Sequence, residues 1–121
     1  WLRNLEGAVI ETVAGFGLEG CRFPPNTGVW VGGRKICAIG IKVRRWVSMH
    51  GIALNCDADL RPFSLIVPCG IRSHGVTSLT LELGRTITIE DAKPCLIKGF
   101  ETVFGADDGS IQPEENPEPC R

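Results

Sequence analysis

Apolar residues at the start of the chain recur at the 3.6-residue spacing of an amphipathic helix, which predicts a helix over residues 1–16. The residues that set this spacing are Leu2, Leu5, Val9, Val13 and Phe16. A second long helix is predicted near the other end of the chain. Thr88 can cap it, with Asp91 at the third helical position, and it would run to about residue 104. Pro94 lies too late for a first-turn proline, so a later start or a kink is expected.

Between these helices the pattern changes to the alternation of β-strands. Two predicted strands, residues 27–31 and 34–43, flank Gly32-Gly33, a dipeptide that favours a two-residue hairpin turn with positive φ. A third strand is predicted over residues 46–57. Gly40 and Gly51 lie inside these strands, where glycine often marks a bulge or the close approach of a ligand.

Shorter elements complete the pattern. An extended stretch at residues 18–23 leads into the turn Pro24-Pro25-Asn26, and a helical turn is expected at residues 59–64. Thr77 can cap a short helix that ends at residue 83. A hairpin sheet with flanking helices indicates an α+β fold.

The length and composition fit one domain with an uneven distribution of charge. The 121 residues are 43% hydrophobic, enough for a core, and no apolar run approaches the roughly 18–20 residues of a membrane span. The formal net charge is −1, but residues 105–121 carry five acids against Arg121, which leaves about +3 on residues 1–104. We expect a folded domain over residues 1–104 and a disordered, acidic, proline-rich tail over residues 105–121. The mild basic excess is not the dense basic stripe of a nucleic-acid-binding protein, but it suits an acidic protein partner.

The six cysteines are scattered through the chain rather than closely paired. Cys37 and Cys56 lie in strand-like apolar sequence, where a thiol behaves as a small hydrophobic group. The sequence has no Cys-x-x-Cys or Cys-x-x-His pair, which argues against structural zinc. We therefore expect reduced thiols in an intracellular compartment.

Cys69 is the best candidate for a nucleophile. It lies between Pro68, whose ring fixes its own φ, and Gly70, which leaves the backbone N–H accessible to a developing oxyanion. The thiolate is the reactive form of cysteine, and a nearby ammonium raises its population. Lys35, just after the predicted hairpin turn, can supply that ammonium if it points inward; a solvent-facing lysine is the alternative.

Two histidines are candidate bases toward this thiol. His74 lies in the loop Ser73-His74-Gly75, where a solvated side chain is the simplest interpretation. His50 precedes Gly51 in a predicted strand and fits equally well as part of a pocket wall or as a structural partner.

Three cations, Lys42, Arg44 and Arg45, follow the central predicted strand. Charges at such positions usually solvate a sheet and protect its edge. The alternative interpretation is a docking surface for an acidic carrier protein.

Several segments of the chain share one recognisable pattern. They are TGVWVGGRKICAIG at residues 27–40, SMHGIALN at residues 48–55, VPCG at residues 67–70 and GVTSL at residues 75–79. Their order and spacing, including the lysine-to-cysteine interval, resemble the lipoyl(octanoyl) transferase family of lipoate biosynthesis over about residues 2–104. The resemblance is closest to animal mitochondrial members.

The resemblance implies a fold and a reaction. The fold is that of the biotin/lipoate protein ligases, a mixed sheet with flanking helices, present here as a partial domain. Cys69 would attack octanoyl-acyl carrier protein and hold the octanoyl group as a thioester, and Lys35 would lower the pKa of that thiol. A lysine of a lipoyl domain, in an E2 subunit of a 2-oxoacid dehydrogenase or in the glycine-cleavage H protein, would then accept the group. The backbone segments that would line the acyl pocket are Ala38-Ile39-Gly40 and Gly51-Ile52-Ala53, with His50 beside them.

The resemblance also implies what the reaction does not require. No metal, nucleotide or other cofactor is expected, and neither is a nucleic-acid or membrane partner. We expect a monomer in the mitochondrion, with the bacterial cytoplasm as the alternative location.

The family carries an upstream block of Arg-Gly-Gly and Thr-x-His-Gly-Pro-Gly character, the other wall of its acyl site, which this sequence lacks. Because Trp1 stands where Met would begin a protein, we expect a segment of a longer polypeptide that transfers acyl groups poorly in isolation. Two alternatives are an ATP-dependent lipoate or biotin ligase and a truncated product that only binds lipoyl domains. Papain-like hydrolysis is more distant, because no asparagine or aspartate is clearly placed to orient a histidine.

Overall fold

Four antiparallel strands form a meander in the order β1-β2-β3-β4. The computed structural model describes residues 1–66 and 75–105. The strands are β1 (Cys21–Phe23), β2 (Asn26–Val31), β3 (Arg34–Arg44) and β4 (Val47–Leu54). The helical elements are α1 (Leu2–Ala14), the 3-10 helix η1 (Arg61–Leu65), α2 (Leu79–Leu83) and α3 (Ile89–Phe104). These elements confirm the α+β prediction, with strands that are antiparallel throughout the described sheet.

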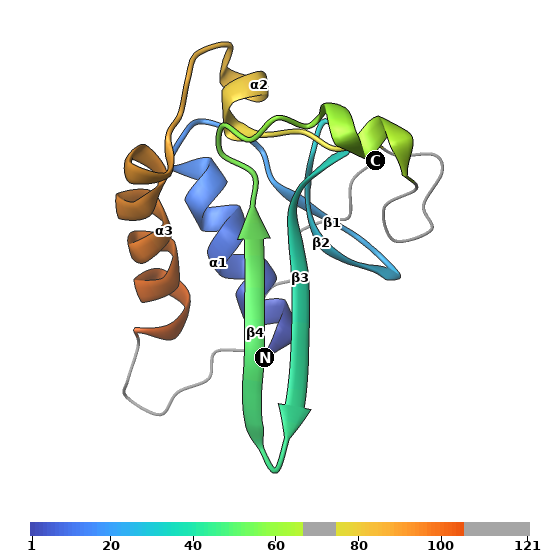
Figure 1. Cartoon of the computed structure of the whole chain (residues 1–121). Coiled ribbons are helices and arrows are strands. Elements are labelled where there is room, and N and C mark those ends of the chain that lie inside the picture. The colour runs from blue at the N-terminus through green and yellow to red at the C-terminus, as the bar shows by residue number, and fades with distance from the viewer. Residues whose placement is uncertain (67–74, 106–121) are drawn as a thin grey trace.

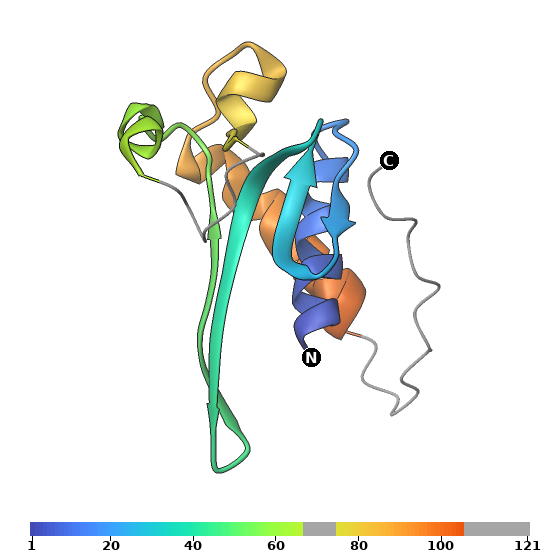
Figure 2. The ribbon, with the colours of Figure 1, turned by 90° about the vertical axis from the view of Figure 1, so that its right-hand side faces the viewer.

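Helices α1 and α3 lie on one side of the sheet, and in the part of the chain that the structure describes neither of these two helices covers the other face of β3 and β4 (Figures 1 and 2). The amphipathic pattern of α1 is confirmed: Val9 and Val13 are fully buried against Val29 and Ile36 of the sheet. None of the described helices is both long and apolar enough to cross a bilayer. The tail predicted over residues 105–121 lies outside the described residues from position 106 onward.

Helices α1 and α3 approach each other closely at Gly99. A methyl group at this buried position would overlap the carbonyl oxygen of Ala8 and would lie 2.6 Å from the hydroxyl oxygen of Thr12. The absence of a side chain at position 99 therefore sets how closely the two helices approach.

The helix caps follow the sequence predictions in one case and differ in the other. Thr88 and Asp91 form the predicted capping box, in which each backbone N–H donates to the other side chain, and α3 continues through Pro94 without the later start that was expected. Helix α2 is capped by Ser78 rather than Thr77, because Ser78 Oγ accepts the N–H of Leu81.

A buried ion pair joins α1 to β1. Glu6 and Arg22 are only 1% and 3% exposed, and Arg22 Nε lies 3.0 Å from Glu6 Oε2. The second carboxylate oxygen, Oε1, accepts the backbone N–H of Gly28 at 3.2 Å. Glu6 thus holds α1, β1 and β2 together through charge-assisted hydrogen bonds.

The turns between β2 and β3 and between β3 and β4 differ in sequence but share a left-handed backbone. Gly32 and Gly33 have φ of 56° and 77°, as predicted. The turn between β3 and β4 is Arg45-Trp46, with φ of 50° and 66°. The predicted third strand therefore starts one residue late, at Val47, because Trp46 belongs to the turn. The β3–β4 hairpin extends well beyond the helices (Figures 1 and 2).

Candidate functional site

An irregularity in β3 determines which face of the sheet Lys35 occupies. Val29 pairs with Cys37 and Trp30 with Lys35, so one step along β2 matches two steps along β3, which leaves Ile36 as the extra residue of a bulge. Ile36 and Cys37 are both fully buried in the core, against the alternation of a regular strand. The bulge therefore turns Lys35 toward the face opposite the core.

The side chain of Lys35 lies against two residues of β2. Its ammonium nitrogen lies 4.8 Å from the ring centroid of Trp30, within the range of a cation–π contact. Beneath it is Gly28, where a methyl group would lie 3.4 Å from Lys35 Cε and 2.6 Å from the carbonyl oxygen of Cys37. Gly28 has φ of 130°, a conformation that glycine adopts most readily. Lys35 is half-buried, so its charge is only partly exposed to solvent.

The backbone of Lys35 binds the chain that follows the predicted nucleophile. Its N–H donates to the carbonyl oxygen of Gly75 at 3.0 Å, and its own carbonyl oxygen accepts the N–H of Thr77 at 2.9 Å. These two bonds make the parallel bridge between Lys35 and Val76. Asn55 holds the same segment from the other side, because its side-chain amide donates to Thr77 O at 3.0 Å.

The predicted nucleophile and its neighbours Pro68 and Gly70 lie outside the described residues, as does His74. The distance between the Lys35 ammonium and the Cys69 sulfur therefore stays a prediction. Gly75, six positions after Cys69 (75 − 69 = 6), is the first described residue beyond this gap, and it is bonded to Lys35.

The two segments predicted to line the acyl pocket are direct partners across β3 and β4. Ala38 pairs with Ala53, Ile39 with Ile52, and Gly40 with Gly51. This regular register places no bulge at Gly40 or Gly51, and a methyl group at either glycine would meet nothing within 4 Å. Of the two predicted roles of these glycines, the bulge is therefore excluded and the close approach of a ligand stays a prediction; the bulge of β3 is at Ile36.

Side chains of the two segments divide between the faces of the hairpin. Ile39 and Ile52 pack against the helix-covered core. The residues at the alternate positions are small and lie on the opposite face of the hairpin, which we call the open face. They are Ala38, Gly40, Gly51 and Ala53.

His50, in β4, directly precedes Gly51 and pairs with Ile41 of β3. It is exposed and has φ of 71°, which is uncommon for a residue other than glycine. In residues 1–66 and 75–105, no three histidine, cysteine or acidic side chains lie close enough to hold a metal ion.

The environments of the other cysteines differ from that expected of a nucleophile. Burial raises the pKa of the Cys37 thiol from 9.0 to about 12, although the Ala53 backbone and the Lys35 charge act in the opposite direction. Burial also raises the pKa of Cys56, as does the neighbouring Asp57. Cys21 is disulfide-bonded, so the expectation of reduced thiols fails at this position. Cys37, Cys56 and Cys95 are free.

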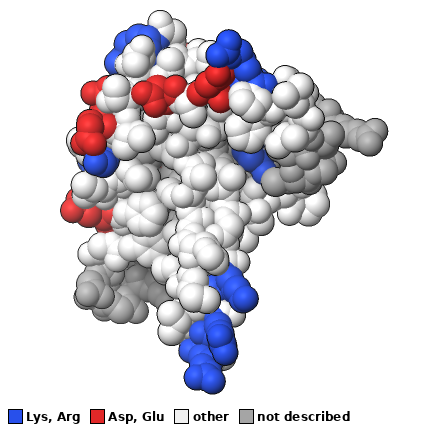
Figure 3. Space-filling view, viewed as in Figure 1, with Lys and Arg blue, Asp and Glu red and all other residues white. Residues whose placement is uncertain are grey.

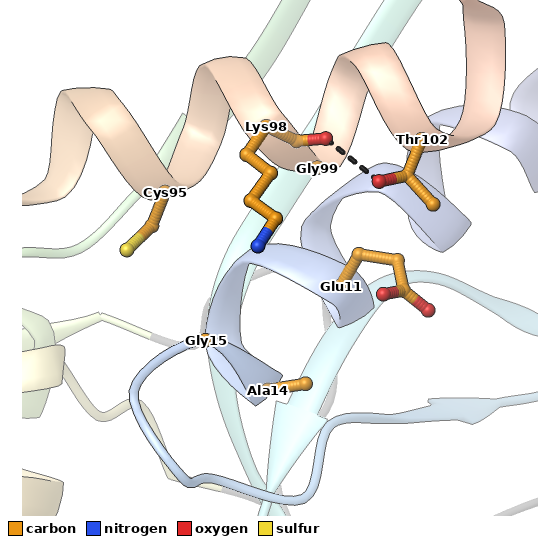
Figure 4. Close-up of a pocket in the computed structure, with 7 residues that line it drawn as sticks. All are labelled: Glu11, Ala14, Gly15, Cys95, Lys98, Gly99 and Thr102. Atoms are coloured by element: carbon orange, nitrogen blue, oxygen red, sulfur yellow. Dashed lines mark hydrogen bonds between the residues drawn. The ribbon is translucent and has the colours of Figure 1, made fainter.

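A pocket of about 360 Å³ lies between α1 and α3, and neither Lys35 nor the paired segments of β3 and β4 line it (Figure 4). It is lined by Glu11, Ala14, Gly15, Cys95, Lys98, Gly99 and Thr102, none of which the sequence pattern singled out. The hydroxyl of Thr102 donates to the backbone carbonyl of Lys98 at 2.9 Å, so its hydrogen is used within the helix.

Sequence reasoning missed the residues that support Lys35. Gly28, Trp30 and Asn55 all lie in the segments that carry the family resemblance, yet each was read only as part of a motif. Their contacts depend on pairing between strands, which the local pattern does not reveal.

The sequence comparison decides the family. Residues 2–101 match the family described as "Lipoyl protein ligase A/B catalytic domain". The chain belongs to this family. An octanoyltransferase of Rubrobacter xylanophilus is 53% identical over 111 residues, which is 91% of this chain and 50% of the relative. The mitochondrial octanoyl-[acyl-carrier-protein]:protein N-octanoyltransferase of Xenopus tropicalis is 55% identical over 98 residues, 81% of this chain and 41% of the relative.

These relatives qualify two expectations. The chain spans about half the length of the curated relatives it matches. The expected animal mitochondrial origin is not confirmed, because the bacterial and the animal proteins are about equally similar to the chain.

Solved structures confirm the predicted fold. Lipoate-protein ligase A bound with ATP matches with a TM-score of 0.71 at 19% identity, over 86% of this chain and 44% of that protein. The biotin protein ligase of Aquifex aeolicus matches with a TM-score of 0.65 at 14% identity, over the same 86% of this chain and 44% of its own length. The chain thus has a biotin/lipoate ligase-like fold and forms part of that domain.

Proposed function

We propose that this chain is the part of an octanoyltransferase that carries the nucleophile and the residue that activates it. The observation that carries the proposal is the pair of backbone hydrogen bonds between Lys35 and the segment that follows Cys69. Family membership and two octanoyltransferase relatives above 50% identity support the choice of reaction.

The proposed reaction has two steps. The Cys69 thiolate attacks the carbonyl carbon of an octanoyl thioester on acyl carrier protein; a new C–S bond forms, the C–S bond to the carrier breaks, and the carrier leaves as a thiolate that takes up a proton from water. A neutral lysine amine of a lipoyl domain then attacks the acyl-enzyme. The amide C–N bond forms, the C–S bond to Cys69 breaks and releases its thiolate, and the proton lost by the amine passes to solvent, which balances the proton taken up by the carrier thiolate. Since the donor is already an activated thioester, neither step requires ATP.

The proposed role of Lys35 is electrostatic. Its ammonium favours the thiolate form of Cys69, and contact with Trp30 and Gly28 restricts where that charge can lie. The paired segments of β3 and β4 would form one wall of the acyl site, because their open face carries Ala38, Gly40, Gly51 and Ala53. His50, at the end of this wall, would border the substrate.

The proposed partners are octanoyl-acyl carrier protein as donor and lipoyl domains as acceptors, including those of E2 subunits and the H protein. We propose a monomer with no further cofactor. A mitochondrial location and a bacterial cytoplasmic one both agree with the relatives, one of which is named as mitochondrial.

Transfer without ATP is the test that separates this proposal from ligase chemistry. The full-length native protein is incubated with octanoyl-acyl carrier protein and an unmodified lipoyl domain, and the mass of the lipoyl domain is measured. We expect octanoylation without ATP, and no octanoylation when free octanoate and ATP replace the carrier. The reverse result would assign the protein to the ATP-dependent ligases, and binding without transfer would favour a non-catalytic role.

Replacing Lys35 with methionine should shift the pH dependence of acylation upward. At about 4 Å, two unit charges interact with about 1 kcal/mol in bulk water and about 4 kcal/mol at an effective dielectric constant near 20. If the two groups lie this close, loss of the ammonium should raise the pKa of the Cys69 thiol, because the thiolate loses its nearby opposite charge. The acyl-enzyme should then form more slowly at pH 7 and recover toward alkaline pH.

The matched control for this experiment is Lys42→Met, which removes an exposed lysine from the same strand. Rates of single-turnover acylation from octanoyl-N-acetylcysteamine, which needs no carrier docking, are compared between pH 6 and 10. An unchanged pH profile in Lys35→Met would remove Lys35 from the proposed mechanism.

A further inference from the structure

The tip of the β3–β4 hairpin presents an exposed group of cations and apolar side chains. We define the hairpin tip as residues 42–47, Lys42 to Val47. Trp46 is 99% exposed, and its flanking residues Val43 and Val47 are 57% and 62% exposed. Lys42, Arg44 and Arg45 are exposed as well, and none of the ion pairs of the described residues involves them.

Charge on the hairpin has a single sign. No acidic residue occurs from Arg34 to Cys56, so these cations have no carboxylate near them in the sequence. Figure 3 shows the basic side chains at the end of the hairpin with no acidic side chain around them on that face, whereas acids gather over the helical side. The tip is therefore complementary to an acidic protein surface.

Folding alone does not account for the turn sequence. Two-residue turns with positive φ at both positions favour Asn-Gly or Gly-Gly, as at Gly32-Gly33. Arg45-Trp46 adopts the same left-handed conformation with two large side chains and holds both in solvent. A turn that keeps less favourable residues while exposing them fully fits a surface used for binding.

We propose that the hairpin tip docks the acidic acyl carrier protein that donates the acyl group. This rests on the proposed function. The carrier's acidic surface would contact Lys42, Arg44 and Arg45, and Trp46 would insert between its side chains, since exposed aromatic and arginine residues are typical anchors of protein interfaces.

The distance from the candidate site favours the donor over the acceptor. Ten positions separate Lys35 from Arg45 (45 − 35 = 10), roughly 30 Å at a strand rise of about 3.3 Å per residue. A thioester at the end of a phosphopantetheine arm extends far from its carrier. An acceptor lysine extends only a side-chain length from its domain, which must therefore bind closer to the nucleophile.

The test separates docking from chemistry. Binding of octanoyl-acyl carrier protein to the full-length native protein is measured in the Cys69→Ala background, where the acyl group is not removed. Transfer is measured separately with Cys69 intact. The test variant is Lys42→Gln/Arg44→Gln/Arg45→Gln, and the charge-matched control on the helical side is Arg85→Gln/Lys93→Gln/Lys98→Gln.

We expect the test variant to weaken carrier binding and to raise the KM for octanoyl-acyl carrier protein by about 10-fold or more, with the difference shrinking at high salt. The KM for the lipoyl domain and the rate with octanoyl-N-acetylcysteamine should stay near wild type. The control should behave as wild type. Unchanged carrier binding, or a rise in the KM for the lipoyl domain instead, would overturn the docking proposal while leaving the proposed reaction intact.

A second variant tests the docking proposal in a protein whose fold is not weakened. Arg45→Asn/Trp46→Gly installs a preferred turn, so its melting temperature should equal or exceed that of wild type while its carrier affinity falls. If the variant is stable and still binds the carrier normally, the turn side chains have no part in docking.

Discussion

Replacing Cys69 with alanine should abolish the octanoyl-enzyme intermediate and reduce transfer by at least about 10³-fold, because removal of a covalent nucleophile leaves only binding and positioning. The full-length protein is exposed to octanoyl-acyl carrier protein without an acceptor, and digested peptides are analysed by mass spectrometry. The octanoyl group should be on the peptide that contains Cys69.

The other thiols support this choice and provide its control. Cys37 is fully buried with a pKa raised to about 12, so at pH 7 to 9 it stays protonated and out of contact with substrate. Cys95 lies on α3 and lines the pocket between α1 and α3, which Lys35 does not line. A Cys95→Ala variant should therefore retain the intermediate. A thioester that survives in Cys69→Ala would place the nucleophile elsewhere and contradict the proposed mechanism.

Replacing Glu6 with alanine should destabilise the fold by about 2–3 kcal/mol, because it removes a buried carboxylate that accepts a charge-assisted hydrogen bond from Arg22 Nε. The change also removes the acceptor of the Gly28 N–H. Gly28 lies beneath Lys35, so we expect the backbone that positions the Lys35 side chain to shift as well. Urea unfolding of the full-length protein, followed by tryptophan fluorescence, measures the effect.

Arg3 offers a control on the same carboxylate. It contacts Glu6 Oε2 at 3.1 Å, but its side chain is 52% exposed. An Arg3→Met variant should lose about 1 kcal/mol or less, as exposed ion pairs do. Equal losses in the Glu6 and Arg3 variants would show that burial of the Glu6–Arg22 pair does not contribute as we infer.

Local signals in the sequence predicted those parts of the fold that depend on neighbouring residues. The spacing of Val9 and Val13 marks the buried face of α1, Gly32-Gly33 marks a left-handed turn, and Thr88 with Asp91 marks the start of α3. In each case the residues that determine the conformation lie within a few positions of it.

The features that local reasoning missed depend on residues far apart in the chain. The bulge at Ile36 exists only relative to the register of β2. Glu6 and Arg22 each resemble ordinary surface charges until α1 and β1 bring them together, sixteen positions apart. Ser78 rather than Thr77 caps α2, because the Thr77 hydroxyl instead donates to Glu82 Oε1 at 2.6 Å.

The candidate site was predicted by resemblance more than by pattern. A lysine on a strand is ordinarily a solvated residue, and only the pairing of Lys35 with Trp30 and Gly75 sets it apart. The resemblance identified the motif as a whole, whereas the structure assigns separate contacts to Gly28, Trp30 and Asn55 within it.

The attachment of Gly75 and Thr77 to position 35 is made entirely by main-chain atoms. Reactivity and geometry at this position can therefore be altered independently: glutamine or norleucine would remove the charge, and arginine would keep it on a different group, while each leaves the path of the returning chain as it is. Proline, which has no N–H, would remove the bond to Gly75 O and leave only the bond from Thr77 N–H. Position 35 is thus suited to replacing the ammonium with unnatural groups of graded basicity.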